Sequence, residues 1–199
     1  FYVNAPYGIV LIHNGNLTNT RELEKQLFSV DRRHTNSSSD TEMLLNIFAT
    51  ELQEQINNKK DLDPDFNFKA VTSLHKRIQG SYAVISLISG HGLLAFRDPF
   101  GIRPLVIGKR ISSENKNEWM VASESLVLEN NDYEIVRDVR PGEAIYITNN
   151  GEFFSKQCFD NPKLFPCAFE YVYLARPDSI MNGISVYKAR LKMGDFLAE

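Results

Sequence analysis

The spacing of apolar positions along the first 80 residues predicts helices. Apolar side chains recur three and four residues apart through Leu23–Leu27, 43–52 and 68–78, which is the period of an amphipathic helix. Asn19 and Ser39 precede the first two of these segments, and each is followed three residues later by glutamate. That pattern is typical of a capped helix N-terminus, so we expect helices to begin directly after both residues.

After residue 80 the pattern changes to short apolar runs separated by turn residues. Gly-His-Gly at 90–92 and Asn-Asn-Gly at 149–151 each lie between two such runs, which favours hairpins. An earlier run, 7–12, predicts a buried strand. The other predicted strands are 81–88, 93–96, 104–108, 119–122, 144–148 and 153–154. Helices followed by hairpins favour an α+β layered fold over a repeated βαβ fold.

A break in the pattern near residues 159–167 predicts a domain boundary, because Asp, Asn and two prolines cluster there. We expect residues 1–165 to form one domain and 166–199 to open a second. Within the second part, an apolar run at 169–174 predicts a strand and the spacing along 186–197 predicts a helix. Together these form a βα unit.

Composition excludes several classes of protein. Of the 199 residues 43% are hydrophobic and 24% charged, and the net charge is −3, so there is no basic footprint for nucleic acid. The apolar runs are too short to span a membrane, and no signal peptide is visible. The two cysteines do not form a disulfide framework or a metal motif, so a reducing cytoplasm is expected. The chain starts at Phe1, without Met, and stops within a helical pattern, which indicates a fragment.

Three segments are candidates for chemistry, and each has a purely structural alternative. His13-Asn14-Gly15-Asn16 is either a tight turn or an oxyanion hole, in which the Asn14 amide and the Gly15 N–H supply two donors. Asp40 either complements a helix dipole or binds an ammonium group. The segment 97–105, RDPFGIRPL, suits a structural turn whose arginines could be paired surface charges, and its residues alone indicate no chemistry.

Taken together, the motifs resemble a known family. Along the chain occur HNGNLTN, SDTE, GSYAV, FRDPFGIRPL, ASES and PGEA, an order that resembles the class II, or N-terminal-nucleophile, glutamine amidotransferases. The segments FRDPFGIRPL, FEYVYLARPDS and VYKAR are narrower and resemble the amidophosphoribosyltransferases of purine synthesis. The resemblance implies a four-layer αββα sandwich, followed by the first βα unit of a phosphoribosyltransferase domain.

The resemblance also implies substrates and site residues. In that family an N-terminal cysteine attacks the amide of glutamine, and the released ammonia displaces pyrophosphate from phosphoribosyl pyrophosphate to give 5-phosphoribosylamine. Asn14 and Gly15 match the oxyanion hole, and Asp40 matches the acid that holds the α-amino group of glutamine. Phe169 and Tyr173, two pleats apart on the predicted strand, match aromatic residues lining an ammonia channel. Packing in a core is the alternative for these two rings.

Other expectations concern parts that the sequence does not contain. Cys158 and Cys167 are internal and cannot be an N-terminal nucleophile, so the catalytic cysteine and a carboxylate-binding arginine should precede Phe1. The phosphoribosyl pyrophosphate loop, with Mg²⁺, should follow Glu199, and this chain alone should be inactive. Cys167 matches one ligand of an iron–sulfur cluster that some members hold, but one cysteine does not make a cluster site, so no cluster is expected. A homo-oligomer is expected.

Two rival interpretations stay open at this point. The first is another glutamine-dependent enzyme of the same class, of the sugar-phosphate aminotransferase or asparagine synthetase type. The second is a non-catalytic or regulatory domain, which a missing N-terminal nucleophile would permit. The segment 169–179 argues against the first rival because it resembles only the amidophosphoribosyltransferases.

Overall fold

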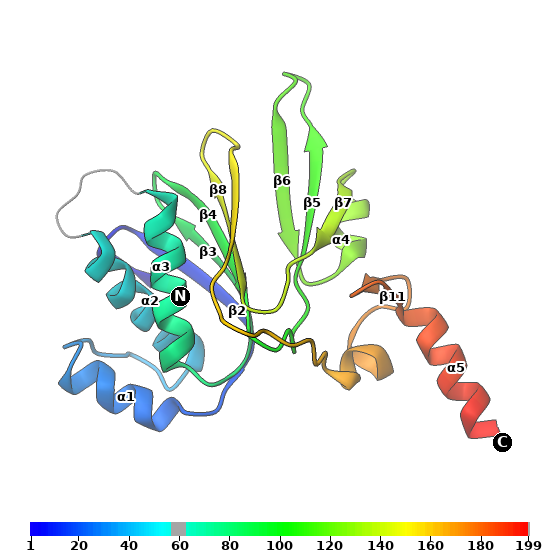
Figure 1. Cartoon of the computed structure of the whole chain (residues 1–199), viewed down its shortest axis with the longest axis horizontal. Coiled ribbons are helices and arrows are strands. Elements are labelled where there is room, and N and C mark those ends of the chain that lie inside the picture. Colours follow the sequence, from blue (N-terminus) through cyan, green and yellow to red (C-terminus); the bar gives the residue numbers. More distant parts are fainter. Residues whose placement is uncertain (57–62, 199) are drawn as a thin grey trace.

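The computed structural model describes residues 1–56 and 63–198 (Figure 1). Its helices are α1 (Thr20–Ser29), α2 (Asp40–Ile56), α3 (Pro64–Arg77), α4 (Ser125–Glu129) and α5 (Val186–Ala198), and η1 (Glu170–Leu174) is a π-helical turn. Its strands are β1 (Tyr2–Val3), β2 (Ile9–Leu17), β3 (Gly80–Ile88), β4 (Gly92–Arg97), β5 (Val106–Ile111), β6 (Asn117–Ala122), β7 (Glu134–Asp138), β8 (Glu143–Thr148), β9 (Phe153–Gln157), β10 (Ile180–Met181) and β11 (Ile184–Ser185). Among these residues no helix is both long and apolar enough to cross a membrane.

Two antiparallel sheets face each other, and helices cover their outer sides (Figure 1). One sheet has six strands in the order β1-β2-β3-β4-β8-β9, and the other has three in the order β6-β5-β7. α1, α2 and α3 cover the larger sheet, whereas Leu128 of α4 packs on the outer face of the smaller one, against Val106 and Ala122. The predicted α+β class and αββα layering are therefore confirmed, with a fourth layer that consists of the short helix α4.

Alternation along the strands divides the apolar side chains between two cores. On β2, Ile9 and Leu11 are buried beneath the helices. The core between the sheets joins side chains of β3, β4 and β8 to the smaller sheet: Ala83, Ala95, Leu105, Ile107, Val139, Ile145 and Ile147. The smaller sheet does not cover β2, where Val10 and Ile12 are 43% and 59% exposed. The even-numbered face of β2 is therefore open at Val10 and Ile12.

The two predicted helix starts are correct, but the capping hydrogen bonds differ from the expected pattern. The Asn19 side chain donates to the Arg77 carbonyl (2.9 Å) and accepts the Gln79 N–H (3.0 Å), so it joins α1 to the end of α3. Glu42 does not reach back to the N–H of Ser39. Its carboxylate accepts from the backbone and side chains of residues 36 and 37 instead, and thereby fixes the loop before α2. Burial raises the pKa of Glu42, but these bonds outweigh it and lower the pKa overall.

Arg97, at the end of β4, is buried in a turn that joins the two sheets. The residue is 1% exposed, and its guanidinium donates to the carbonyl oxygens of Arg103 (2.7 Å), Val139 (2.8 Å) and Gly101 (2.8 Å). Burial lowers the pKa of Arg97, and the neighbouring Asp98 carboxylate opposes that shift. The interpretation of this arginine as a paired surface charge is therefore wrong.

Asp98, which carries the opposite charge, shapes the same turn through hydrogen bonds to backbone N–H groups. Its carboxylate is fully buried and accepts the N–H groups of Phe100 (2.9 Å), Ile102 (3.0 Å) and Arg103 (3.3 Å). It also accepts the N–H of Tyr82 on β3 (3.3 Å). Because each backbone donor has a fixed direction, one side chain determines the path of the turn up to residue 103.

The strand predicted at 169–174 is wrong. This segment forms η1, in which the Ala175 N–H donates to the Glu170 carbonyl five residues earlier (3.0 Å). The side chain of Arg190 closes the turn by donating to the carbonyls of Tyr171 (2.8 Å) and Ala175 (2.7 Å). A short aromatic run fits a strand or a helix equally well, and none of the strands among the described residues pairs with this segment. The domain boundary at residue 165 stays a prediction.

The C-terminal segment is attached along the buried turn and to α4. Backbone N–H groups of residues 163, 165 and 167 donate to carbonyls of residues 99, 100 and 102. Further along, the Glu124 carboxylate accepts the Arg176 N–H (2.9 Å) and the Ser179 hydroxyl (2.7 Å). Figure 1 shows α5 extending away from both sheets beyond these contacts.

We predict that Arg97→Met lowers the free energy of unfolding by about 3–5 kcal/mol, because it strips donors from three carbonyls and leaves Asp98 as an uncompensated buried charge. Urea unfolding followed by circular dichroism measures this loss. Arg176→Met is the matched control, since that exposed guanidinium pairs with the exposed Asp178, and it should leave the urea midpoint unchanged. Equal midpoints for the two variants would contradict the structural role of Arg97.

Candidate functional site

The His13-Asn14-Gly15-Asn16 segment is part of a strand. β2 runs through it to Leu17, and Asn14 and Gly15 lie opposite Ala83 and Tyr82 of β3. The tight-turn interpretation is therefore wrong. Asn-Gly commonly marks a hairpin turn, but here a nine-residue strand continues through it.

The pairing pattern of β2 determines the direction of the Gly15 N–H. At the two ends of the pairing, the Thr18 N–H donates to Gln79 O and the Ser89 N–H to Gly8 O (both 2.8 Å). In an antiparallel pair such bonds involve alternate residues, so the even-numbered residues of β2 bond to β3. Odd-numbered residues turn their N–H groups to the opposite edge, where the Leu11 N–H donates to the carbonyl of Phe1, the residue before β1 (3.0 Å). The Gly15 N–H points to that edge, beyond the reach of β1.

Only glycine fits at position 15. Its φ is +146°, a region that side chains disfavour. A Cβ would lie 2.7 Å from the carbonyl carbon of Ser81 and 2.9 Å from Nε2 of His13. The backbone can pass this close to β3 only without a side chain, which leaves the Gly15 N–H accessible at the sheet edge.

The Asn14 amide is held in one orientation by Arg103. Its Oδ1 accepts from Nε (3.1 Å) and Nη2 (2.7 Å) of that arginine. Its Nδ2 points to Ser123 Oγ at 3.4 Å. A cavity of about 100 Å³ borders this amide between the sheets, lined also by Ile12 and Leu105. The amide therefore presents its NH₂ group, rather than its oxygen, to the cavity side.

Asp40 lies beside the same edge of β2 as the Gly15 N–H. Its Oδ2 accepts the Leu17 N–H at 3.0 Å, and its Oδ1 is 3.9 Å from Nδ1 of His13. Since a strand rises about 3.4 Å per residue, the N–H groups of Gly15 and Leu17 are about 7 Å apart. An anionic group and a free donor are thus separated by the length of a small molecule. Among the described residues no direct hydrogen bond joins Asp40 to Asn14.

The imidazole ring of His13 is buried between Asp40 and β3 and carries no charge. Its ring nitrogens lie 3.3 Å from Thr41 Oγ1 and 3.4 Å from the Ser81 carbonyl. Burial lowers the pKa of His13, while the Ser81 carbonyl and the Asp40 carboxylate oppose this shift. The imidazole is therefore uncharged at neutral pH and does not neutralise Asp40.

Phe169 and Tyr173 are brought together by a helical turn rather than by a strand. Their ring centroids are 6.1 Å apart, edge to face, because residues four apart lie on one side of a helical turn. They are 61% and 65% exposed, so they do not pack in a core of this chain. Glu170 lies between them in sequence and its Oε1 is 2.9 Å from Arg103 Nη2.

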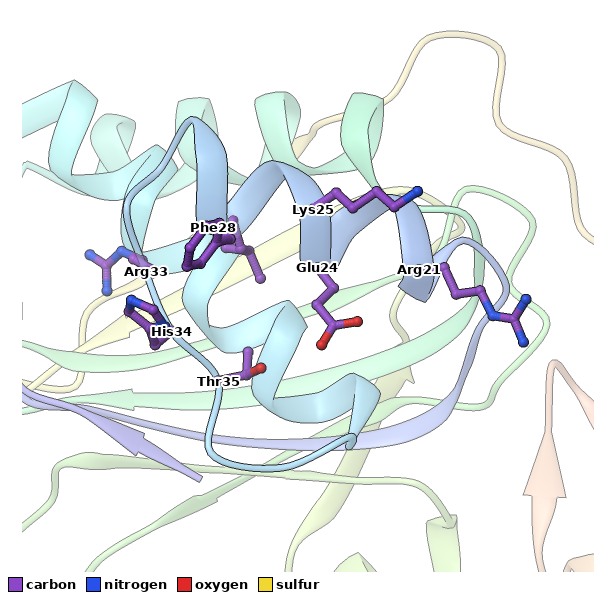
Figure 2. Close-up of a pocket in the computed structure, with 8 residues that line it drawn as sticks. Arg21, Glu24, Lys25, Phe28, Arg33, His34 and Thr35 are labelled. Carbon is purple, nitrogen blue, oxygen red and sulfur yellow. The ribbon is translucent and has the colours of Figure 1, made fainter.

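A larger cavity, about 590 Å³, lies on the other side of the larger sheet, between α1 and the loop after it (Figure 2). Phe28 and His34 contact each other there edge to face. Figure 2 shows Arg21 and Arg33 pointing in opposite directions and Glu24 lying between them. The charged groups do not converge on one point, so this cavity lacks the arrangement seen at β2.

Neither cysteine is placed as a nucleophile. Cys158 is buried in the helix-side core, and burial raises the pKa of its thiol to about 11, so it stays protonated at neutral pH. Cys167 is half-buried in the segment beside the turn. Over residues 1–56 and 63–198 no three His, Cys, Asp or Glu side chains form a group that could hold a metal ion. Absence of an iron–sulfur cluster from the whole protein stays a prediction.

Sequence reasoning missed Arg103, Ser123 and Glu170. Each contacts the Asn14 amide or the group that holds it. The density of Arg, Asp, Pro and Gly in 97–105 was a signal that the turn matters, but it did not indicate which arginine reaches Asn14.

Comparison with known proteins decides the family. The model of the glutamine amidotransferase domain family matches residues 2–130. The chain belongs to the glutamine amidotransferase family. The match includes Asn14, Gly15, Asp40 and Arg103.

Individual relatives carry a narrower name. The chain is 56% identical over 199 residues to an amidophosphoribosyltransferase of Escherichia coli (strain K12), and 48% identical over 209 residues to that of Schizosaccharomyces pombe. Both matches cover 100% of this chain and 39% of the relative. A solved glutamine phosphoribosylpyrophosphate amidotransferase from B. subtilis, complexed with ADP and GMP, is 29% identical with a TM-score of 0.80, over 100% of this chain and 39% of that one. The chain thus spans about two fifths of its relatives' length.

We predict that Gly15→Ala shifts the thermal unfolding midpoint down by several degrees, because the new Cβ forces β2 away from Ser81 at a strained φ. Gly90→Ala is the control. Its φ is also positive, at +79°, but a Cβ there meets nothing within 4 Å. Differential scanning calorimetry compares the two variants. Equal midpoints would mean that conformational strain alone, and not the close approach to β3, explains the glycine.

Proposed function

We propose that this chain forms the glutamine-binding part of an amidophosphoribosyltransferase. The whole protein would hydrolyse the side-chain amide of glutamine and transfer the ammonia to phosphoribosyl pyrophosphate, with release of pyrophosphate. The observation that supports this most is the edge of β2, where the Gly15 N–H lies about 7 Å along the strand from the Leu17 N–H that Asp40 binds.

Glutamine fits this edge by its chemistry. Its amide carbonyl would accept hydrogen bonds from Asn14 Nδ2 and the Gly15 N–H, and its α-ammonium would pair with Asp40. When a thiolate adds to the amide carbon, the carbonyl π electrons move to oxygen, and the two donors stabilise that negative charge. Once the proton lost by the thiol has been delivered to the amide nitrogen, collapse of this intermediate expels ammonia and leaves a thioester, which water hydrolyses to glutamate. The thiolate would come from outside this chain, so the isolated chain should be inactive.

Phe169 and Tyr173 are proposed to line the path of the ammonia. Their edge-to-face rings offer an apolar surface, and an apolar surface does not capture a neutral amine by protonation. Support comes from Glu170, which connects the same turn through Arg103 to the Asn14 amide.

The remaining expectations concern the whole protein. Phosphoribosyl pyrophosphate and Mg²⁺ would bind in a phosphoribosyltransferase domain that residues 166–199 begin. A homo-oligomer, a cytoplasmic location, and the absence of nucleic-acid and membrane partners stay predictions. A sugar-phosphate aminotransferase or asparagine synthetase is less well supported, since two relatives matched over the whole chain at 56% and 48% identity bear the amidophosphoribosyltransferase name.

We predict that Asn14→Ala in the full-length protein lowers the kcat of glutamate release about 10²- to 10³-fold. The effect should fall on kcat more than KM because the charge on the oxygen exists mainly in the transition state. Synthesis from free ammonia should persist. Asn16→Ala is the control, since that exposed asparagine lies two residues along and its amide donates to the Leu17 carbonyl. Parallel loss of both activities, with a lowered melting point, would assign Asn14 a structural role instead.

We predict that Asp40→Asn weakens glutamine use and spares synthesis from ammonia. Loss of a charge-assisted bond to the α-ammonium, about 1.5–3 kcal/mol, lowers kcat/KM for glutamine about 10- to 10²-fold. Asparagine keeps an oxygen that can accept the Leu17 N–H, so the melting temperature should change little. Steady-state assays with glutamine and with ammonium salts separate the two activities. An equal fall in both would support the helix-dipole alternative.

A further inference from the structure

Arg103 contacts both the Asn14 amide and the C-terminal segment. It emerges from the turn shaped by Asp98, which accepts its backbone N–H. Its guanidinium donates twice to Asn14 Oδ1, and its Nη2 lies 2.9 Å from Glu170 Oε1. Its side chain is 19% exposed, so these partners replace most of its contact with water.

The two bonds determine which end of the Asn14 amide faces the substrate. A guanidinium donates and cannot accept, so only Oδ1 can face Arg103. The NH₂ group then has to point toward Ser123 and the cavity. Rotation of the amide by 180° would place NH₂ against the guanidinium and present an acceptor, which would repel an oxyanion. Charge-assisted bonds to Oδ1 also polarise the amide and make its N–H groups stronger donors.

Glu170 ties this arginine to η1. The carboxylate is 6% exposed, and Arg103 is the one cation with which it forms an ion pair among the described residues. Its Oε1 accepts no well-aligned hydrogen bond despite the short separation from Nη2. Burial raises the pKa of Glu170, and Arg103 opposes that shift. A buried carboxylate with a single cationic partner constrains that partner strongly.

From these contacts we infer that Arg103 is a positioning residue for the Asn14 oxyanion donor, and that Glu170 links its position to η1, the turn that carries Tyr173. The inference rests on the proposed glutaminase function. It adds that displacement of η1 changes the amide donor, so the segment lining the proposed ammonia path also sets the rate at which ammonia is released.

The test is a mutant cycle in the full-length protein, with glutamate release as the readout. Arg103→Lys keeps the charge but loses the planar guanidinium that donates two hydrogen bonds to one acceptor. It should lower kcat about 10- to 10²-fold with little change in KM for glutamine. In an Asn14→Ala background the same change should cost less than about 2-fold, because Arg103 acts only through Asn14. Glu170→Gln should lower kcat about 3- to 30-fold and should likewise have no effect when Asn14 is alanine.

Glu124→Gln is the matched control. Glu124 holds the same C-terminal segment, through Arg176 and Ser179, without touching Arg103, although its charge also acts on Glu170, so kcat should change much less than in Glu170→Gln. An equal loss in Glu124→Gln and Glu170→Gln would overturn the link through Glu170. If Arg103→Lys lowered kcat by the same factor with and without Asn14→Ala, the positioning role would be overturned. If Arg103→Lys melts below the assay temperature, Glu170→Gln decides through the same cycle. A wild-type protein that releases no glutamate would instead refute the proposed function itself.

Discussion

The site depends on a pair of opposite charges buried in one turn. Arg97 and Asp98 lie adjacent in sequence and are almost inaccessible to water. Burying charges costs several kcal/mol each unless every polar atom has a partner, and here backbone carbonyls surround the cation while backbone N–H groups surround the anion. These hydrogen bonds restrict the turn to a single backbone path between the two sheets. The turn ends near Arg103, whose side chain donates a hydrogen bond to Asn14 on β2 of the larger sheet.

The second constraint is the exposed edge of β2. A strand normally uses its N–H groups on both sides, but β1 pairs only with residues 9 and 10 of β2 in the sheet register. Beyond that point the edge donors are available: Leu17 binds Asp40, and Gly15 lies two residues before it. A regular strand places donor and carboxylate more reproducibly than a loop would, because both positions follow from the register with β3. The proposed binding of a molecule with an amide and an ammonium group relies on that spacing.

Local patterns predicted most of the fold and part of the site. The hairpins 81–96 and 144–154 and the helices around Leu23–Leu27 and 43–52 were predictable because alternation and helical spacing reflect burial directly. Local pattern failed at 169–174, where an aromatic run without a partner strand became a helical turn held by Arg190. It also favoured a turn at Asn14-Gly15, since the pairing that keeps this segment extended comes from residues 82 and 83. Arg103 could not be assigned because its partner Asn14 is 89 residues away, and no local pattern encodes such a contact.

The central claim is that the Asn14 amide, turned by Arg103, and the Gly15 N–H converge on one oxygen. A crystal structure of the full-length protein with a glutamine-derived carbonyl analogue in the site measures this directly. The account predicts that Asn14 Nδ2 and Gly15 N each lie about 2.7–3.1 Å from the carbonyl oxygen, with Asn14 Oδ1 still on Arg103. An oxygen directed away from both donors, or an Asn14 amide that has left Arg103 to bind it, would contradict the account.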